Sequence, residues 1–488
     1  MFQPIDPDAE ARNALRLIGP DPQNWVPERA GIRHNVVIVG GGQSGSAFAF
    51  ALRRAGIGKV SVIDAAEDEA QAGVWLTAAR MHVLRTAKNL PGPELGIPAL
   101  SFQSWYETRH GAKAYAAMQR IPRLAWAEYL SWYRHFLDIP IRYHARLSRI
   151  EPAEGHFRLH LEAAGLSTVE TARKVILANG VAGNGGAYIP PVLTEALPKS
   201  LYAHTADAID FAALRGKSVA VIGAAASAFD AAAVALEAGA AAVHLFGRRP
   251  TLASLPVNRV RGYPGAYDNY PEQPDAIRWH QAIRFRRAGS TPPPDAIERV
   301  MSFSNFHLHL AAPWASARAE DGRNVAMAAG EEFRFDFAIA GTGYFVDPAA
   351  RPELADFAGH ILLWRDCFTP PEGEEDPYLG AHPYLGIGQE YLEKVLGAAP
   401  YLKDIHVQNP AGFVSCGFPV GDVPSMKRGV AAVVSRISRD LFFGDFAAHQ
   451  QRMTGDVAPE FAEDLYASAV WRGRPSPRPS PRKRGAEG

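Results

Sequence analysis

The sequence predicts an α/β protein in which one βαβ unit occurs twice. The first observation is size: 488 residues, 47% hydrophobic and 21% charged, can bury the cores of several domains at roughly 150 residues each. The second is that residues 35–64 and 218–247 align without a gap. The third is their shared pattern, an apolar β-branched run, small residues, an Ala/Leu-rich helical stretch and a second apolar run.

The charge and the cysteine content indicate which kinds of binding partner and which cellular compartment to expect. The 51 Lys and Arg balance 51 Asp and Glu, so nothing favours nucleic acid or an anionic membrane as partner. Cys367 and Cys416 stand far apart in unlike contexts, which disfavours both a disulfide scaffold and a thiol pair of the reductase type. The N-terminus lacks the apolar stretch of a secretory signal, and no segment is apolar enough to span a bilayer. We expect a cytoplasmic protein.

The elements between the two copies follow from hydrophobic periodicity. Residues 123–139 place aromatic and leucine side chains at helical spacing, which predicts a core-facing helix. Residues 141–152 and 156–163 alternate like the strands of a hairpin. An apolar strand over 174–177 is stopped by Asn179-Gly180 and is expected to end one domain.

Proline, glycine and charge mark the remainder of the chain. Residues 256–274 and 288–296 are rich in Pro and Gly and are predicted to be surface loops. A last strand is predicted within 335–344, and a helix is predicted to begin near Pro424. The tail over 471–488 is basic and proline-rich and is predicted to be disordered.

The first copy carries the fingerprint G-x-G-x-x-G directly after its first strand. Gly40 allows a tight turn, Gly42 a close approach of pyrophosphate to the helix N-terminus, and Gly45 close packing of helix on strand. Asp64 follows about 20 residues later, where a carboxylate accepts the ribose hydroxyls of an adenosine. The sequence therefore predicts a dinucleotide site formed by Gly40, Gly42, Gln43, Ser44, Gly45 and Asp64.

The second copy departs from this fingerprint. Gly223, Ala225 and Ala228 occupy the three glycine positions, and the Ala225 methyl opposes the closest approach of phosphate. Gly247 replaces Asp64 and is followed by Arg248 and Arg249, which suit the 2′-phosphate of NADPH. A charge-assisted hydrogen bond implies roughly 10- to 100-fold preference for NADPH over NADH. The alternative is that the two arginines form a solvated basic turn.

One dinucleotide fold with an acid and one with arginines suggest a bound FAD and a visiting NADPH, with hydride passing to the flavin. The chain resembles the two-dinucleotide-binding-domain flavoproteins and, within them, the class B flavin-dependent monooxygenases. The resemblance is carried by VIVGGGQSG, the AGVW turn at 72–75, VILANG, the second βαβ unit and IAGTGY. Of that family's fingerprint Phe-x-Gly-x-x-x-His, the segment 198–204 retains only His204.

The resemblance implies two Rossmann-like dinucleotide-binding domains, the FAD domain being discontinuous with the NAD(P)H domain inserted. The expected parts are an N-terminal extension (1–30), an FAD-binding domain (31–190 and 331–445), an NAD(P)H-binding domain (196–330) and the disordered basic tail (471–488).

The resemblance also assigns roles to residues. The first-copy residues hold the adenosine diphosphate of FAD, while Trp75 and Asp422 are expected on the cofactor, Trp75 near the flavin. Gly341 and Gly343 are expected to mark the last strand of the FAD domain. The residues expected to serve NADPH are Gly223, Ser227, Arg248 and Arg249.

Three further features carry alternative interpretations. Arg85 either orients an anionic or carbonyl-bearing substrate, as a catalytic residue, or is a surface arginine. His204, the other candidate catalytic residue, either contacts NADPH or caps the linker. His307 and His309 alternate on one strand without a third ligand nearby in sequence, so no metal is expected.

The resemblance implies an NAD(P)H-dependent flavin monooxygenase. NADPH (or NADH) reduces FAD, O2 adds at flavin C4a, and the peroxyflavin hydroxylates a small organic molecule. The stretches GPDPQNWVP and SWYETRHG are similar to flavoprotein urate hydroxylases of purine catabolism, so a flat polar heterocycle such as urate is the expected substrate. Two alternatives stay open: an NAD(P)H:acceptor flavin reductase without oxygen insertion, and a non-catalytic flavin-binding sensor, to which Ala225 points.

Overall fold

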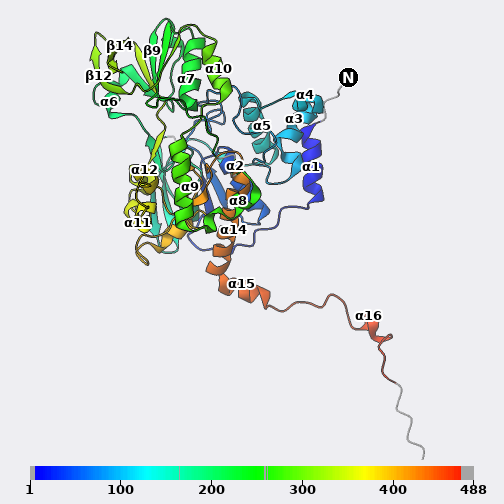
Figure 1. The fold of residues 1–488 in the computed structure, drawn as a ribbon. Coiled ribbons are helices and arrows are strands. Elements are labelled where there is room, and N and C mark those ends of the chain that lie inside the picture. The colour runs from blue at the N-terminus through cyan, green and yellow to red at the C-terminus, as the bar shows by residue number, and fades with distance from the viewer. Residues whose placement is uncertain (1–5, 164, 258–259, 261, 474–488) are drawn as a thin grey trace, which may run out of the picture. The chain divides into compact units, whose positions relative to one another are not determined.

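The computed structural model describes residues 6–163, 165–257, 260 and 262–473. They divide into two compact units, one ending at Phe443 and one beginning at Gly444. The first unit contains two parallel sheets, each built on one copy of the βαβ repeat (Figure 1). The predicted fold class, α/β with two Rossmann-like domains, is confirmed.

The first sheet contains the first copy. Its parallel strands are β3 (Ile141–Arg142), β2 (Val60–Ile63), β1 (His34–Val39), β6 (Leu166–Leu177) and β17 (Ile405–Val407), in that spatial order. Helix α2 (Gln43–Arg54) connects β1 to β2. The antiparallel pair β4 (Ala145–Ala153) and β5 (His156–Ala163) extends the sheet from β6, so the predicted hairpin is confirmed.

The second sheet contains the second copy. Its strands are all parallel and are ordered β11 (Phe306–His309), β10 (Ala242–Phe246), β9 (Ser218–Ile222), β15 (Phe337–Ala340) and β8 (Tyr202–His204). Helix α7 (Ala226–Glu237) connects β9 to β10 and packs beside α10 (Pro294–Met301) (Figure 1). A three-stranded antiparallel sheet of β12 (Trp314–Glu320), β13 (Arg323–Ala328) and β14 (Glu331–Phe335) shares a hydrophobic cluster with this sheet.

The placement of β15 corrects one sequence prediction. The strand within 335–344 was expected to end the FAD domain, but β15 pairs with β9 on one side and β8 on the other. Ala338, Ile339 and Ala340 are fully buried, and an apolar strand of this kind does not reveal which of two parallel sheets it joins. Residues 331–340 therefore belong with the second sheet, and the other predicted domain boundaries stay predictions.

The chain enters and leaves the second sheet through one two-stranded ribbon. β7 (Gly185–Ala187) pairs antiparallel with β16 (Tyr344–Val346). A Cβ on Gly185 would lie 2.0 Å from the carbonyl oxygen of Phe345, so the two strands approach as closely as glycine allows. Because β17 comes after this ribbon and completes the first sheet, the domain built on that sheet is discontinuous, as predicted.

Helices cover the sheets of the first unit. The predicted helix over 123–139 is α5 (Arg123–Phe136), and its Trp126, Tyr129 and Tyr133 are buried in a core shared with α2 and α14. The remaining helices are α1 (Pro7–Leu17), α3 (Phe102–His110), α4 (Ala112–Ala117), α6 (Pro191–Thr194), α8 (Pro264–Asp268), α9 (Asp275–Ala288), α11 (Trp364–Cys367), α12 (Pro377–Gly380), α13 (Phe413–Cys416) and α14 (Met426–Gly444).

Two predicted loops contain helical structure. Helix α8 lies within 256–274, and α10 begins inside 288–296, because a proline at the first helical position is compatible with a helix start. Tyr270 in the first of these segments is buried, and its hydroxyl donates to the carbonyl oxygen of Arg278 at 2.9 Å.

The second unit is described up to residue 473 and contains α15 (Phe446–Met453) and α16 (Asp464–Ala467). The predicted disordered tail lies outside the described residues from position 474 onward. Across the described ranges, every helix is too short or too polar to cross a bilayer.

Candidate cofactor and active site

The first candidate site is the turn between β1 and α2. Gly40 has a φ of +109°, and a Cβ there would lie 2.2 Å from the carbonyl oxygen of Ala178. A Cβ on Gly45 would lie 1.8 Å from the carbonyl oxygen of Gly40, so only glycine permits this packing. Gly42 is the N-cap of α2, and a Cβ there would meet only the Cα of Gly73, at 3.7 Å. The helix N-terminus is therefore open to a phosphate.

The carboxylate of Asp64 is fixed against this turn. One oxygen accepts the backbone N–H of Gly41 at 2.6 Å, and the other accepts the N–H of Ala66 at 2.8 Å. Each carboxylate oxygen can accept a second hydrogen bond, so ribose hydroxyls can still be bound. The structure thus brings Asp64 and the fingerprint glycines together.

Gln43 joins the turn to two distant segments. Its amide nitrogen donates to the carbonyl oxygen of Gly421 at 3.0 Å, and its amide oxygen accepts from the indole of Trp126 at 3.3 Å. Trp126 in turn packs edge-to-face on Trp75, with ring centroids 6.3 Å apart. The predicted residues Gln43 and Trp75 therefore belong to one cluster. Sequence reasoning identified Trp126 only as a core residue.

Asp422 follows directly on Gly421 and is placed beside the first turn by the Gln43 contact. Its carboxylate accepts the N–H of Ser425 at 2.9 Å, and burial raises the pKa of Asp422 to about 6. The Ser425 hydroxyl accepts the N–H of Gly421 at 3.0 Å, which closes the loop before α14. Ser425 was not predicted, although an Asp three residues before a backbone donor is a capping signal.

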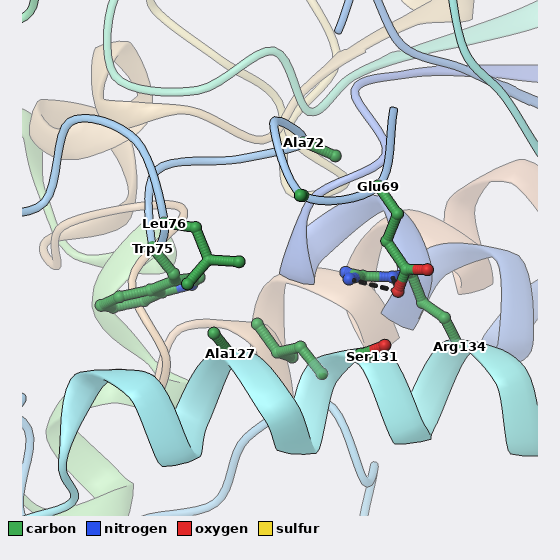
Figure 2. A pocket seen from close by; sticks show the side chains of 9 residues that line it. Glu69, Ala72, Trp75, Leu76, Ala127, Ser131 and Arg134 are labelled. Atoms are coloured by element: carbon green, nitrogen blue, oxygen red, sulfur yellow. Dashed lines mark hydrogen bonds and ion pairs between the residues drawn. The ribbon is translucent and has the colours of Figure 1, made fainter. Parts of the chain in front are cut away.

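A cavity of about 250 Å³ adjoins Trp75 (Figure 2). It lies between the segment 69–76 and helix α5. At one end, Arg134 donates twice to one carboxylate oxygen of Glu69, at 2.9 and 3.1 Å. Its lining consists of Glu69, Ala70, Ala72, Trp75, Leu76, Ala127, Leu130, Ser131 and Arg134. The cavity thus combines an apolar wall with a charged end.

The second candidate site is the turn between β9 and α7. Gly223 has a φ of +118°, and a Cβ there would lie 2.3 Å from the carbonyl oxygen of Gly341. Ala225 is the N-cap of α7, and Ser227 is exposed on the first helical turn. A Cβ on Gly341 would lie 2.6 Å from the Cβ of Ala228. The alanine in the third fingerprint position is therefore accommodated because Gly341, on the neighbouring strand end, has no side chain.

The two arginines after β10 have different surroundings. Arg249 donates to the carbonyl oxygen of Ala288 at the end of α9, at 3.0 Å. Arg248 is exposed at the same strand end. Arg248 is thus the better placed of the two for a 2′-phosphate.

His204 ends β8 and is fully buried. Its Nδ1 accepts the N–H of Ala206 at 3.0 Å, and its ring packs edge-to-face on Tyr344. Burial lowers the pKa of His204, and the nearby backbone of Gly343 partly opposes this shift. His204 and Gly343 therefore lie together at the ribbon that joins the two sheets.

Arg85 lies apart from the first turn. Its guanidinium donates to Asp230 of α7 at 3.0 Å, so it is associated with the second candidate site. The predicted roles of Arg85 and His204 toward substrate and NADPH stay predictions.

A relative among characterised proteins decides the family. A FAD-dependent urate hydroxylase from Xanthomonas campestris pv. campestris is 38% identical over 442 residues, covering 90% of this chain and 93% of that protein. The chain belongs to the class B flavin-dependent monooxygenases. A family model described as pyridine nucleotide-disulphide oxidoreductase matches residues 37–262 of this monooxygenase. Its two cysteines are both free, one exposed and one buried.

Solved structures of similar fold agree with this membership. The ornithine hydroxylase PvdA from Pseudomonas aeruginosa is 18% identical with a TM-score of 0.65, covering 84% of this chain and 100% of that chain. L-lysine 6-monooxygenase from Pseudomonas syringae is 16% identical with a TM-score of 0.61, covering 84% and 99%. At these identities the likeness concerns the fold.

As a class B flavin-dependent monooxygenase, the protein uses FAD and NAD(P)H, and it acts on a small molecule and O2. The residues present fit both cofactors. The first turn offers an open helix N-terminus and a fixed acid, and the second offers an exposed arginine where the acid is missing. Which side chain contacts which cofactor atom stays a prediction.

Proposed function

We propose that this monooxygenase hydroxylates urate or a comparable flat, polar heterocycle in purine catabolism. The observation that carries the proposal is the 38% identity to a FAD-dependent urate hydroxylase over 90% of this chain. A match of that extent includes both nucleotide-binding turns and most of the chain beyond them. The cytoplasmic location expected from the cysteine content belongs to the same proposal.

FAD, once bound and reduced by NADPH, supplies the activation of O2. The residues of the chain bind the cofactors, orient the substrate and keep water away from the flavin. The turn of Gly40, Gly42 and Gly45 receives the pyrophosphate of FAD, with Asp64 on the ribose. Gln43 ties this turn to the Gly421-Asp422 segment, so the cofactor is held from both sides. The packed rings of Trp75 and Trp126 would give the bound cofactor an apolar neighbour that limits the access of water.

The second turn receives NADPH. Gly223 and the N-terminus of α7 face the pyrophosphate, Ser227 adds a hydroxyl, and Arg248 binds the 2′-phosphate. His204 and Gly343 lie at the joining ribbon, and we expect His204 to contact NADPH from there. Keeping His204 neutral suits it to hydrogen bonding rather than to charge pairing.

The test is coupled turnover. Purified FAD-loaded enzyme is supplied with NADPH, O2 and urate, and NADPH consumption, urate loss, hydrogen peroxide and product mass are measured together. We expect nearly one hydroxylated product for each NADPH, and mostly peroxide when urate is omitted. NADPH oxidation without a hydroxylated product from urate or related heterocycles, with fast reduction of an artificial acceptor, would instead identify an acceptor reductase.

A further inference from the structure

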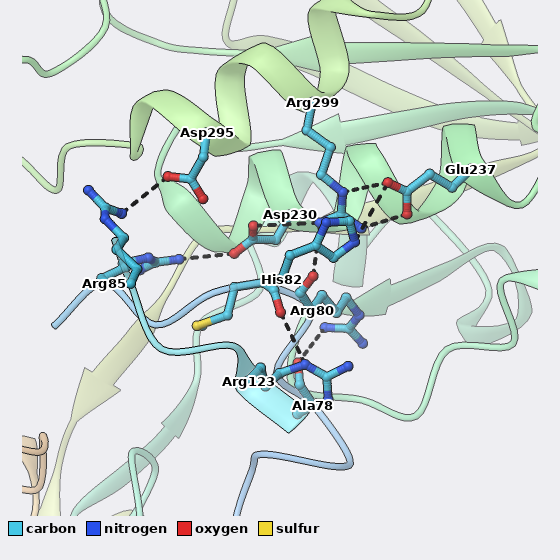
Figure 3. Close-up of polar contacts among 11 residues, drawn as sticks. Ala78, Arg80, His82, Arg85, Arg123, Asp230, Glu237, Asp295 and Arg299 are labelled. Atoms are coloured by element: carbon cyan, nitrogen blue, oxygen red, sulfur yellow. Dashed lines mark hydrogen bonds and ion pairs between the residues drawn. The ribbon is translucent and has the colours of Figure 1, made fainter. Parts of the chain in front are cut away.

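A group of charged side chains lies between the two sheets, and apart from Arg85 its members have no role in the sites described so far (Figure 3). It is centred on residues 78–85, here named the bridging segment, which follows Trp75 along the chain. On the side of the first sheet, Arg123 at the start of α5 donates to the carbonyl oxygen of Met81 at 3.0 Å and also to that of Trp75. The segment is thus anchored to the flavin-side tryptophan.

The other side of the bridging segment is anchored to the second sheet. Arg80 donates to the carbonyl oxygens of Thr205 and Asp207, directly after β8, at 2.5 and 3.0 Å. Arg299 of α10 donates to the carbonyl oxygen of Arg80 at 2.9 Å and forms a double contact with Glu237 of α7. The segment therefore contacts both the second sheet and its helices.

The most unusual contact of this group is the one between Arg85 and Asp230. Asp230 lies in α7 and is only 3% exposed. Its carboxylate lies 3.0 Å from the guanidinium of Arg85 and 4.0 Å from that of Arg299. Burial raises the pKa of Asp230, whereas both arginines oppose this shift and favour the charged form.

The repeat shows that this acid is not required by the fold. In the ungapped alignment of the two copies, the residue equivalent to Asp230 is Ala47, which is fully buried in the hydrophobic core of the first sheet. A buried carboxylate destabilises a helix packed on a sheet unless it is paired. Arg299 of α10 lies 4.0 Å from this carboxylate, whereas the closer partner, Arg85 at 3.0 Å, comes from the segment next to the flavin side. The shorter of the two contacts therefore forms only when α7 and that segment are docked.

We propose that Asp230 and Arg85 are positioning residues for hydride transfer. Their ion pair fixes α7, whose N-terminus receives NADPH, relative to the segment that carries Trp75. In the step concerned, a hydride leaves NADPH, giving NADP⁺, and reduces the bound FAD; neither Asp230 nor Arg85 gains or loses a proton. A displacement of about 1 Å between reacting groups can slow such a step by roughly 100-fold. The proposal rests on the use of FAD and NADPH, not on urate as substrate.

The experiment measures anaerobic reduction of the FAD-loaded enzyme by NADPH in a stopped-flow instrument, without substrate. For R85Q and D230N we expect the limiting rate of flavin reduction to fall roughly 10- to 100-fold, while the half-saturating NADPH concentration changes less than about threefold. R85K keeps the charge and should recover part of the rate. Loss of positioning also predicts that the flavin spectrum and flavin content are unchanged.

The matched control is R120Q. Arg120 pairs with Asp295 of α10 at 3.2 Å, so this pair also joins the α5 region to the second sheet's helices. Arg85 and Arg120 are both partly exposed, but Asp295 is 43% exposed whereas Asp230 is buried. We expect R120Q to reduce flavin within about twofold of the unmodified enzyme, since exposed pairs contribute little.

Three results would overturn the proposal. They are an unchanged limiting rate in R85Q or D230N, an equal loss in R120Q, and a change confined to the half-saturating NADPH concentration. If R85Q does not fold, D230N decides, because it removes the buried charge with little change in shape. Failure of urate hydroxylation alone leaves this assay unaffected, so the two proposals fail separately.

Discussion

The two nucleotide-binding turns have the same length but achieve close packing differently. Helices α2 and α7 each span 12 residues and occupy equivalent positions in the repeat. In the first turn the missing side chain is on the helix, where Gly45 packs on the carbonyl of Gly40. In the second the helix carries Ala228, and the missing side chain is on the neighbouring strand end, at Gly341. The missing side chain thus relieves a different close contact in each unit, one within the first turn and one between the second helix and its neighbouring strand.

The charged residues of the two copies also differ. The first copy has Asp64 after its second strand and Ala47 in its helix, whereas the second has Gly247-Arg248 and Asp230 at these places. Both helices make polar contacts with distant parts of the chain. Those of the first come from Gln43, Arg53 and Arg54 near its ends, whereas the second has an acid on its buried face, Asp230, which pairs with the partly exposed Arg85. This difference suits a first unit that keeps FAD bound and a second unit whose NADPH must be aligned with that FAD.

The largest expected effect is that of Gly45→Ala. Its Cβ would lie 1.8 Å from the carbonyl oxygen of Gly40, and backbone cannot move aside as a side chain can. We expect protein with little bound flavin and a clearly lower melting temperature, measured by absorbance and calorimetry. The matched change in the second unit, Ala228→Gly, should leave flavin content unchanged. Full flavin content in Gly45→Ala would contradict this account, because it would show that the first turn also tolerates a methyl group at the third fingerprint position.

Gly341→Ala tests the compensation in the second unit. Its new Cβ would lie 2.6 Å from that of Ala228, and we expect a loss of about 1–3 kcal/mol in unfolding free energy. The double variant Gly341→Ala/Ala228→Gly should recover part of this loss, because the Cβ–Cβ contact is removed while the Cα at position 228 still lies 2.9 Å from the new Cβ. This predicts a favourable coupling in a denaturant-based double-mutant cycle. Strictly additive effects would contradict the proposed exchange of side chains across this contact.

The arginines test the predicted cofactor division. Replacing Arg248 by Gln should lower the ratio of kcat/KM for NADPH over NADH by roughly 10- to 100-fold. Arg249→Gln should have a smaller effect, because the Arg249 guanidinium already donates to Ala288. Equal losses in both variants would mean that the two arginines share the phosphate.

The two sheets should also differ in acid sensitivity. In the second, burial and the neighbouring His307 and His309 lower the pKa of His244 from 6.5 to about 4. The unfolded chain therefore takes up a proton first, and stability falls as pH drops from about 6.5 to 4. In the first, Arg142 lowers the pKa of Glu170 from 4.5 to about 2, so its contribution is lost as pH drops from about 4.5 to 2.

Denaturant unfolding over this pH range separates the two groups. His244→Gln should flatten the dependence in the upper window, and Glu170→Gln that in the lower window. A His244→Gln protein with an unchanged slope between pH 6.5 and 4 would show that the imidazole pair of the second sheet does not control this part of the curve.

The smallest expected effect is that of Ala225→Gly. Ala225 caps α7 where the first copy has Gly42, and removing its methyl allows a closer approach of the pyrophosphate. We expect the dissociation constant of the nicotinamide dinucleotide to fall by a few-fold. It is measured by titrating the oxidised enzyme with NADP⁺, which binds without reducing the flavin, and is compared with the value for NADPH. Weaker binding would show that the methyl contributes to the site rather than obstructing it.

The sequence was sufficient for features that are local along the chain. The repeat predicted both βαβ units, and the glycines predicted the turns, because each requirement involves residues close in sequence. The sheet of β15 was predicted wrongly, since its buried alanines suit either sheet. The meeting of Gln43 with Gly421, and of Arg85 with Asp230, depends on packing between segments far apart in the chain, which no local pattern records.

The measurement that tests the division between the two units most directly is an anaerobic titration of the purified chain with NADPH, followed by visible absorbance. The account predicts one bound flavin per chain that is bleached by one equivalent of NADPH. A colourless protein that cannot be reconstituted with FAD, or a bound flavin that stays oxidised, would contradict it.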